Sequence, residues 1–116
     1  MVKRKESSAL DEVFFALSDP TRRGILARLT QGELPVSELA RPLDMSLPAV
    51  SKHLRVLRRA RLVRQTKVGR VRLCSLNPIP LREAADWIGL YRGFWEQRLD
   101  ALAEYLRQSE EDEPRH

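Results

Sequence analysis

Residues 36–59 read VSELARPLDMSLPAVSKHLRVLRR. The run from Val36 to Arg41 predicts a short helix, which Pro42 prevents from extending because proline lacks the backbone N–H that a helix interior needs. Ser46 is a favourable N-cap for a second helix over about residues 47–59. Two helices separated by so short a turn have the spacing of a helix-turn-helix.

The second of these helices has two unlike faces. One face carries the apolar residues Leu47, Val50, Leu54 and Leu57, and the other carries Ser51, Lys52, Arg55, Arg58 and Arg59. The apolar face suits docking on a scaffold, and the small polar and cationic face suits entry into a DNA groove. Taken alone, the pattern equally fits an ordinary solvated surface helix.

A basic hairpin follows directly and favours the DNA-binding interpretation. Residues 62–68 and 71–76 are rich in β-forming side chains, and Gly69-Arg70 between them predicts a tight turn. Cations at an exposed hairpin tip can follow a phosphate backbone. The residues expected to contact DNA are Ser46, Ala49, Ser51, Lys52, His53, Arg55 and Arg58 of the helix, and Lys67, Arg70 and Arg72 of the hairpin. For His53 the open alternative is packing at the edge of the helix, and Arg55 and Arg58 can reach either bases or phosphates.

The flanking sequence predicts three more helices. One covers residues 9–17; a second begins with Asp19 as N-cap and Pro20 and runs to about Thr30; the last covers about residues 79–107 as one long helix. The expected fold class is therefore α+β, mostly α: four helices, a β-hairpin wing and a long C-terminal helix. Residues 1–8 are expected to be a flexible arm, 9–107 one domain for DNA binding and dimerisation, and 108–116 an acidic disordered tail.

Charge is distributed very unevenly along the 116 residues. The stretch from Met45 to Arg82 holds ten cations and no Asp or Glu, whereas the rest of the chain holds 11 cations and 16 anions. The net charge of +5 is thus the sum of +10 in one third of the chain and −5 elsewhere. Such asymmetry predicts a polyanionic partner, with double-stranded DNA as the leading candidate.

Several classes of protein are not expected from this sequence. A single cysteine, Cys74, cannot form an internal disulfide, and no apolar run has the roughly 20 residues of a membrane span. The basic N-terminus is not followed by the apolar segment of a signal peptide, so we expect a cytoplasmic, nucleoid-associated protein with no membrane partner. No catalytic constellation, phosphate-binding glycine loop or ligand cluster is visible, so we expect neither an enzyme nor a cofactor.

The motifs resemble those of the ArsR family of winged helix-turn-helix transcriptional repressors. The resemblance rests on segments that occur in the family's order and spacing over about residues 9–107. They are ALSDPTRRGIL from Ala16, VSELA from Val36, SLPAVSKHLRVL from Ser46, GRVRL from Gly69, LNP from Leu76 and FWEQRL from Phe94. The resemblance implies a repressor that binds a double-stranded DNA operator.

The resemblance also implies a homodimer that pairs through its first and last helices. The sequence agrees independently, because all seven aromatic residues fall in those two predicted helices. The residues expected at the dimer interface are Leu10, Phe14, Trp87, Ile88, Tyr91, Trp95, Leu99 and Leu102. Ala85, Gly89 and Gly93 form a small-residue stripe on which a second helix can approach closely, with packing inside one chain as the alternative.

Some features of the family are missing or changed. Residues 33–40 hold no cysteine pair and the last helix holds no histidine, so neither of the family's usual metal sites is expected. Relatives often have glutamine where this chain has Leu47, and glycine where it has Arg61. Arg61 is strained if its backbone needs positive φ. Otherwise the turn at this position differs slightly from the turn in those relatives. Cys74 is interpreted as a small buried apolar residue, with a redox switch as the alternative.

The expected function is that of a homodimeric, sequence-specific repressor that blocks a promoter and does not respond to metals. The alternative is a winged-helix adapter that binds proteins and no longer reads DNA, supported only by the changes at Leu47 and Arg61. The sequence identifies no inducing signal. A small apolar ligand near the aromatic residues Phe14, Trp87, Phe94 and Trp95, a partner protein, and autoregulation without a ligand all fit.

Overall fold

The computed structural model describes residues 5–112. The chain divides into two compact units, one ending at Ala84 and the other beginning at Ala85. The order of elements in the first unit is α1, α2, β1, α3, α4, β2, β3 and the start of α5. This arrangement confirms the predicted α+β, mostly helical, winged helix-turn-helix class.

The first four helices lie close to their predicted positions. They are α1 (Lys5–Leu17), α2 (Pro20–Leu29), α3 (Val36–Ala40) and α4 (Leu47–Arg59). The predicted cap of α2 is confirmed, since Asp19 Oδ2 accepts a hydrogen bond of 3.1 Å from the backbone N–H of Arg22. One boundary was wrong: α1 begins at Lys5, four residues before the predicted start at residue 9. Residues 5–8 of the predicted arm are therefore helical, and residues 1–4 lie outside the described part.

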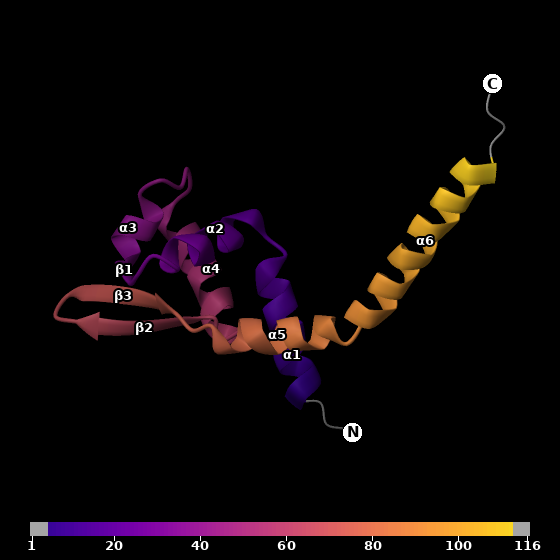
Figure 1. Cartoon of the computed structure of the whole chain (residues 1–116). Helices are drawn as coiled ribbons and strands as arrows, with labels where there is room; N and C mark the ends of the chain where they lie inside the picture. The colour runs from indigo at the N-terminus through magenta and orange to yellow at the C-terminus, as the bar shows by residue number, and fades with distance from the viewer. Residues whose placement is uncertain (1–4, 113–116) are drawn as a thin grey trace. The chain divides into compact units, whose positions relative to one another are not determined.

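The hairpin forms as predicted from β2 (Val63–Val68) and β3 (Val71–Leu76), and Figure 1 shows it projecting from the helices of the first unit. Gly69 has a φ of 64°, the left-handed conformation that a two-residue loop of this kind demands at its first central position. Sequence analysis missed the short strand β1 (Leu34–Pro35), which pairs antiparallel with β3 and gives the sheet order β1-β3-β2. A two-residue strand is too short to show the alternation by which strands are found in a sequence.

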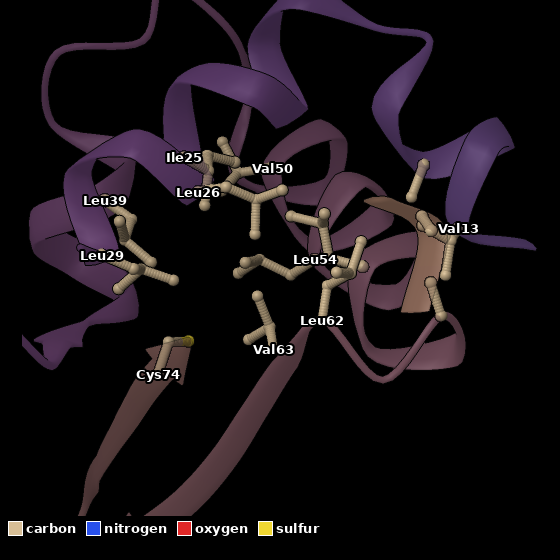
Figure 2. Packing of buried hydrophobic residues seen from close by; sticks show 14 residues of the cluster. Val13, Ile25, Leu26, Leu29, Leu39, Val50, Leu54, Leu62, Val63 and Cys74 are labelled. Atoms are coloured by element: carbon tan, nitrogen blue, oxygen red, sulfur yellow. The ribbon is translucent and has the colours of Figure 1, made fainter. Parts of the chain in front are cut away.

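One apolar core joins the helices to the sheet in the first unit. Its buried side chains come from α1, α2, α3, α4, the sheet, the segment that joins α4 to β2, and the start of α5. Figure 2 shows Ile25 and Leu26 of α2 lying with Val50 of α4, while Cys74 enters from β3. Leu57 of α4 is completely buried in the same core. The core thus fixes the inner face of α4 and leaves its outer face free.

The predicted long helix over residues 79–107 is wrong, because the chain forms two helices there. α5 covers Ile79–Gly89 and α6 covers Arg92–Asp112. At the break, the N–H groups of Leu90 and Tyr91 bond to carbonyls three residues back instead of four. Gly89 and Gly93 flank the break, and each glycine disfavours a helix by about 1 kcal/mol relative to alanine. The predicted small-residue stripe is therefore split between two helices.

The acidic tail also differs from its prediction. α6 continues to Asp112, so residues 108–112 are helical, and residues 113–116 lie outside the described part. From Ala85 to Asp112 every described residue is exposed, including the aromatic ones. The second unit thus has helices but no buried core within one copy of the chain.

Candidate nucleic-acid interface

Helix α4 begins at the residue that the sequence predicts. Ser46 Oγ accepts a hydrogen bond of 3.3 Å from the N–H of Ala49, and Pro48 lies in the first turn, where its missing N–H is not needed. Val50, Leu54 and Leu57 are buried on the inner face. The apolar stripe predicted for this helix is therefore confirmed at these three positions, whereas Leu47 at its start is exposed.

The outer face of α4 and the hairpin expose nearly all of the predicted DNA contacts. The exposed residues are Ser46, Ser51, Lys52, Arg55, Arg58, Lys67, Arg70 and Arg72, whereas Ala49 is half-buried. Within residues 8–112, the part of the chain with described side chains, none of the six cations in this set forms an ion pair or a side-chain hydrogen bond. An exposed and unneutralised cation keeps its charge available for an external anion. We call these six residues, Lys52, Arg55, Arg58, Lys67, Arg70 and Arg72, the cationic surface.

His53 differs from the other predicted contacts because it faces the scaffold. It is half-buried, and its Nδ1 lies 3.1 Å from Nη1 of Arg22 and 3.9 Å from Oδ2 of Asp19. Because the guanidinium can only donate, Nδ1 is the acceptor when this hydrogen bond forms. The side chain therefore ties α4 to the start of α2, which is the packing alternative left open for His53.

Arg22 is the residue whose role sequence analysis missed. It is buried, and its Nε and Nη2 donate to the carbonyls of Ala16 (2.9 Å) and Phe15 (3.0 Å) at the end of α1. A cation at a helix C-terminus also interacts favourably with the helix dipole. The side chain of Arg22 on α2 is thus hydrogen-bonded to both α1 and α4. The signal for this role is its place in the first turn of α2, three residues after the capping residue Asp19.

Arg61 adopts the strained conformation considered above. Its φ is 63°, and it is the one residue other than glycine with positive φ in the described chain. The hydrogen bond of 2.9 Å from Asn77 Nδ2 to the carbonyl of Arg61 holds this turn between α4 and β2. The arginine therefore occupies a backbone position that glycine adopts more easily.

The predicted dimer residues fall into two groups. Leu10 and Phe14 of α1 are half-buried against the core of the first unit. The other six, Trp87, Ile88, Tyr91, Trp95, Leu99 and Leu102, are exposed in the second unit. Trp87 and Tyr91 lie edge to face with ring centres 5.4 Å apart, so neighbouring aromatic rings contact each other on an exposed surface.

Two further predictions concern reactive and metal-binding groups. Cys74 is completely buried, and burial raises the pKa of its thiol, although Gln65 and Arg58 act in the opposite direction. The redox switch needs an exposed thiolate, so the structure favours the buried apolar interpretation. In the described residues, no three His, Cys, Asp or Glu side chains gather as metal ligands would.

Comparison with known proteins agrees with this geometry. A helix-turn-helix domain family matches residues 17–66. The HTH-type transcriptional regulator Rv2034 of Mycobacterium tuberculosis is 44% identical over 102 residues, which is 88% of this chain and 92% of that protein. A crystal structure of an ArsR family transcriptional regulator matches with a TM-score of 0.72 and 42% identity, covering 76% of this chain and 97% of that one. The chain belongs to the ArsR family.

Membership of the ArsR family confirms the resemblance on which the sequence analysis relied. The transcriptional repressor SdpR of Bacillus subtilis, 34% identical over 79 residues, covers 68% of this chain and 88% of its own length. The protein is thus a helix-turn-helix transcriptional regulator whose α3 and α4 form the motif that gives the domain its name. None of the helices in the described part of the chain has the length and apolar character of a membrane span.

Proposed function

We propose that this ArsR family protein is a homodimeric repressor that binds a specific DNA operator and blocks the promoter that overlaps it. The observation that carries the proposal is the cationic surface, which covers the outer face of α4 and the hairpin and has no acidic partner among the described residues. In this account α4 enters the major groove, where Ser51, Lys52 and Arg55 face base edges. The wing cations Lys67, Arg70 and Arg72 contact backbone phosphates.

The exposed apolar residues of α6 support the dimer. Trp95, Leu99, Leu102 and Leu106 follow one another at steps of four, three and four residues, so they share one face of the helix. All four are more than half exposed in a single copy. A contiguous apolar stripe of this kind is typical of a helix that pairs with another helix. A symmetric dimer can place its two α4 helices in successive major grooves, roughly 34–36 Å apart.

We also propose that the repressor does not respond to transition metals. The acidic residues of α6 offer carboxylates only, and transition metals prefer imidazole or thiolate ligands. Among the described residues, the thiol of Cys74 lies buried in the core, and Nδ1 of His53 lies 3.1 Å from Nη1 of Arg22 and 3.9 Å from Oδ2 of Asp19. Calorimetric titration of the untagged protein with Zn²⁺ tests this statement, and binding at micromolar concentration would contradict it.

Genome-wide footprinting of the bound protein, followed by affinity measurements on the recovered operator, tests the proposed function. The double variant Arg55→Ala/Arg58→Ala should lose about tenfold or more in operator affinity, since a good base contact such as that of Arg55 contributes roughly 1–3 kcal/mol and Arg58 adds a phosphate contact. Arg92→Ala/Arg107→Ala removes the same charge from α6, where both arginines pair with glutamates, and serves as the matched control.

Two results would overturn the assignment. One is an operator affinity that is unchanged in the Arg55/Arg58 double variant. The other is the absence of any discrete genomic footprint, which is what the protein-adapter alternative predicts. The control variant should bind the operator like the unmodified protein, so a loss common to both double variants would reveal only a general effect of charge.

A further inference from the structure

A cavity of about 420 Å³ lies in the first unit where α4, β2 and α5 meet. Its wall includes three arginines from the end of α4 and the start of β2, namely Arg58, Arg61 and Arg64. Val63 and Pro80 contribute buried apolar surface, and Glu83 of α5 is its one acidic residue. The cavity thus carries three positive charges against one negative charge.

The three arginines have no anionic partner in the chain. Among residues 8–112, whose side chains are described, none of their guanidinium groups donates a hydrogen bond or forms an ion pair, with Glu83 or with any other acid. Like charges gathered in one concave place repel each other, and a bound anion relieves that repulsion. The planar guanidinium fork matches the oxygens of a phosphate group in particular.

The strained backbone at Arg61 supports a functional role for its side chain. A φ of 63° disfavours every residue with a Cβ, and glycine would remove the strain. The turn is nevertheless held firmly, because Asn77 donates from Nδ2 to the carbonyl of Arg61 and from its backbone N–H to that of Leu62, both at 2.9 Å. Retained strain at a rigidly held position is typical of a functional residue.

We propose that this cavity is a binding site for a phosphate group, held by Arg58, Arg61 and Arg64. The phosphate has two sources, a backbone phosphate of the bound duplex or a free phosphorylated small molecule. The first source rests on the proposed DNA-binding function, and the second does not. Arg61 and Arg64 would then extend the set of anion-binding residues beyond those predicted from the sequence.

The test compares Arg61→Gly with Arg82→Ala in two assays. Arg61→Gly removes one guanidinium and relieves the backbone strain, so its midpoint of thermal unfolding should equal or exceed that of the unmodified protein. Lost binding in this variant cannot then be ascribed to unfolding. Arg82→Ala removes an exposed cation from the same acid-free stretch but outside the cavity wall, and controls for general charge.

In the first assay, inorganic phosphate is titrated into the free protein while the arginine side-chain N–H signals are followed by NMR. In the second, the affinity for a random-sequence duplex is measured as a function of salt concentration. A saturable shift that Arg61→Gly abolishes and Arg82→Ala retains identifies a site for free phosphate. A salt slope that becomes shallower by about one in Arg61→Gly alone identifies a duplex phosphate.

The proposal is overturned if neither assay separates Arg61→Gly from the unmodified protein, or if Arg82→Ala matches Arg61→Gly in both. An unmodified protein that binds no duplex would contradict the proposed function, while the phosphate titration would still decide on the cavity. Glu83→Gln removes the one opposing charge and should strengthen phosphate binding. Weaker binding in Glu83→Gln would contradict an anion site at this place.

Discussion

The two units of the chain contrast in how they dispose of apolar side chains. In the first unit, 14 apolar residues are buried in one core, and they hold α4 with its outer face free. In the second unit, large apolar residues such as Trp95 and Leu99 are about 60% exposed, and none is buried between Ala85 and Asp112. The first unit therefore buries its apolar side chains within one copy, whereas the second leaves them exposed, as the proposed dimer requires.

The units also differ in charge. The acid-free stretch Met45–Arg82 lies in the first unit with its ten cations. Residues 85–112 hold three cations and seven anions, a net charge of −4. Because duplex DNA repels acidic surfaces, this separation favours DNA binding at the first unit and disfavours it at the second. The contrast shows that apolar exposure and positive charge lie on different units of one small protein, which is the basis for proposing a different partner for each.

The largest expected effect compares a leucine from each unit. Leu57→Ala should lower the free energy of unfolding by about 3 kcal/mol, because its side chain is completely buried and truncation leaves a cavity. Leu99→Ala should change the stability of the dilute monomer by less than about 0.5 kcal/mol, because that side chain is 60% exposed. Urea unfolding followed by circular dichroism measures both. Equal losses would show that the second unit has a core of its own.

A smaller effect concerns the arginine that joins three helices of the first unit. Arg22→Met should lower the free energy of unfolding by about 2 kcal/mol, since it leaves the Phe15 and Ala16 carbonyls without their buried donor. Its neighbour Arg23 is exposed and donates only to the carbonyl of Leu17, so Arg23→Met should cost about 0.5 kcal/mol. Urea unfolding measures the free energy of unfolding of both variants. A larger loss in Arg23→Met than in Arg22→Met would contradict the role assigned to Arg22.

The smallest effect is a pH dependence at the start of α2. The hydrogen bond from the Arg22 N–H, with the nearby His53 and Arg22 charges, holds the pKa of Asp19 below its ordinary value, although desolvation opposes them. A lowered folded-state pKa means that Asp19 stabilises the fold at neutral pH and that this contribution is lost as pH falls through the lowered pKa. Unfolding measured from neutral to acidic pH should show this loss, and Asp19→Asn should remove that component. A pH profile of unfolding in Asp19→Asn that is identical to that of the unmodified protein would contradict this role of Asp19.

Most of the first unit could be predicted from the sequence because its signals are local. Asp19 and Ser46 cap helices, Gly69 makes a turn, and the period of Val50, Leu54 and Leu57 gives the inner face of α4. The position of the cationic surface follows from the same period. Such local signals act within one or two turns of the chain and need no knowledge of the tertiary structure.

What could not be predicted depends on contacts between distant segments or on small balances of energy. The strand β1 exists only because β3 pairs with it, and the role of Arg22 depends on how α1 and α4 meet around it. The break between α5 and α6 depends on whether two glycines outweigh the helix propensity of their neighbours. The cavity at Arg61 requires a fold that brings residues 58–64 and 77–83 together.

The most direct test of the contrast between the units is sedimentation equilibrium of the full chain. The account predicts a mass of twice 13.4 kDa for the unmodified protein, and 13.4 kDa for Leu99→Asp/Leu102→Asp with the helical content of the first unit retained. Operator affinity should fall in the same variant, because one copy offers one recognition helix. An unmodified protein that sediments at 13.4 kDa up to about 100 μM would contradict the account.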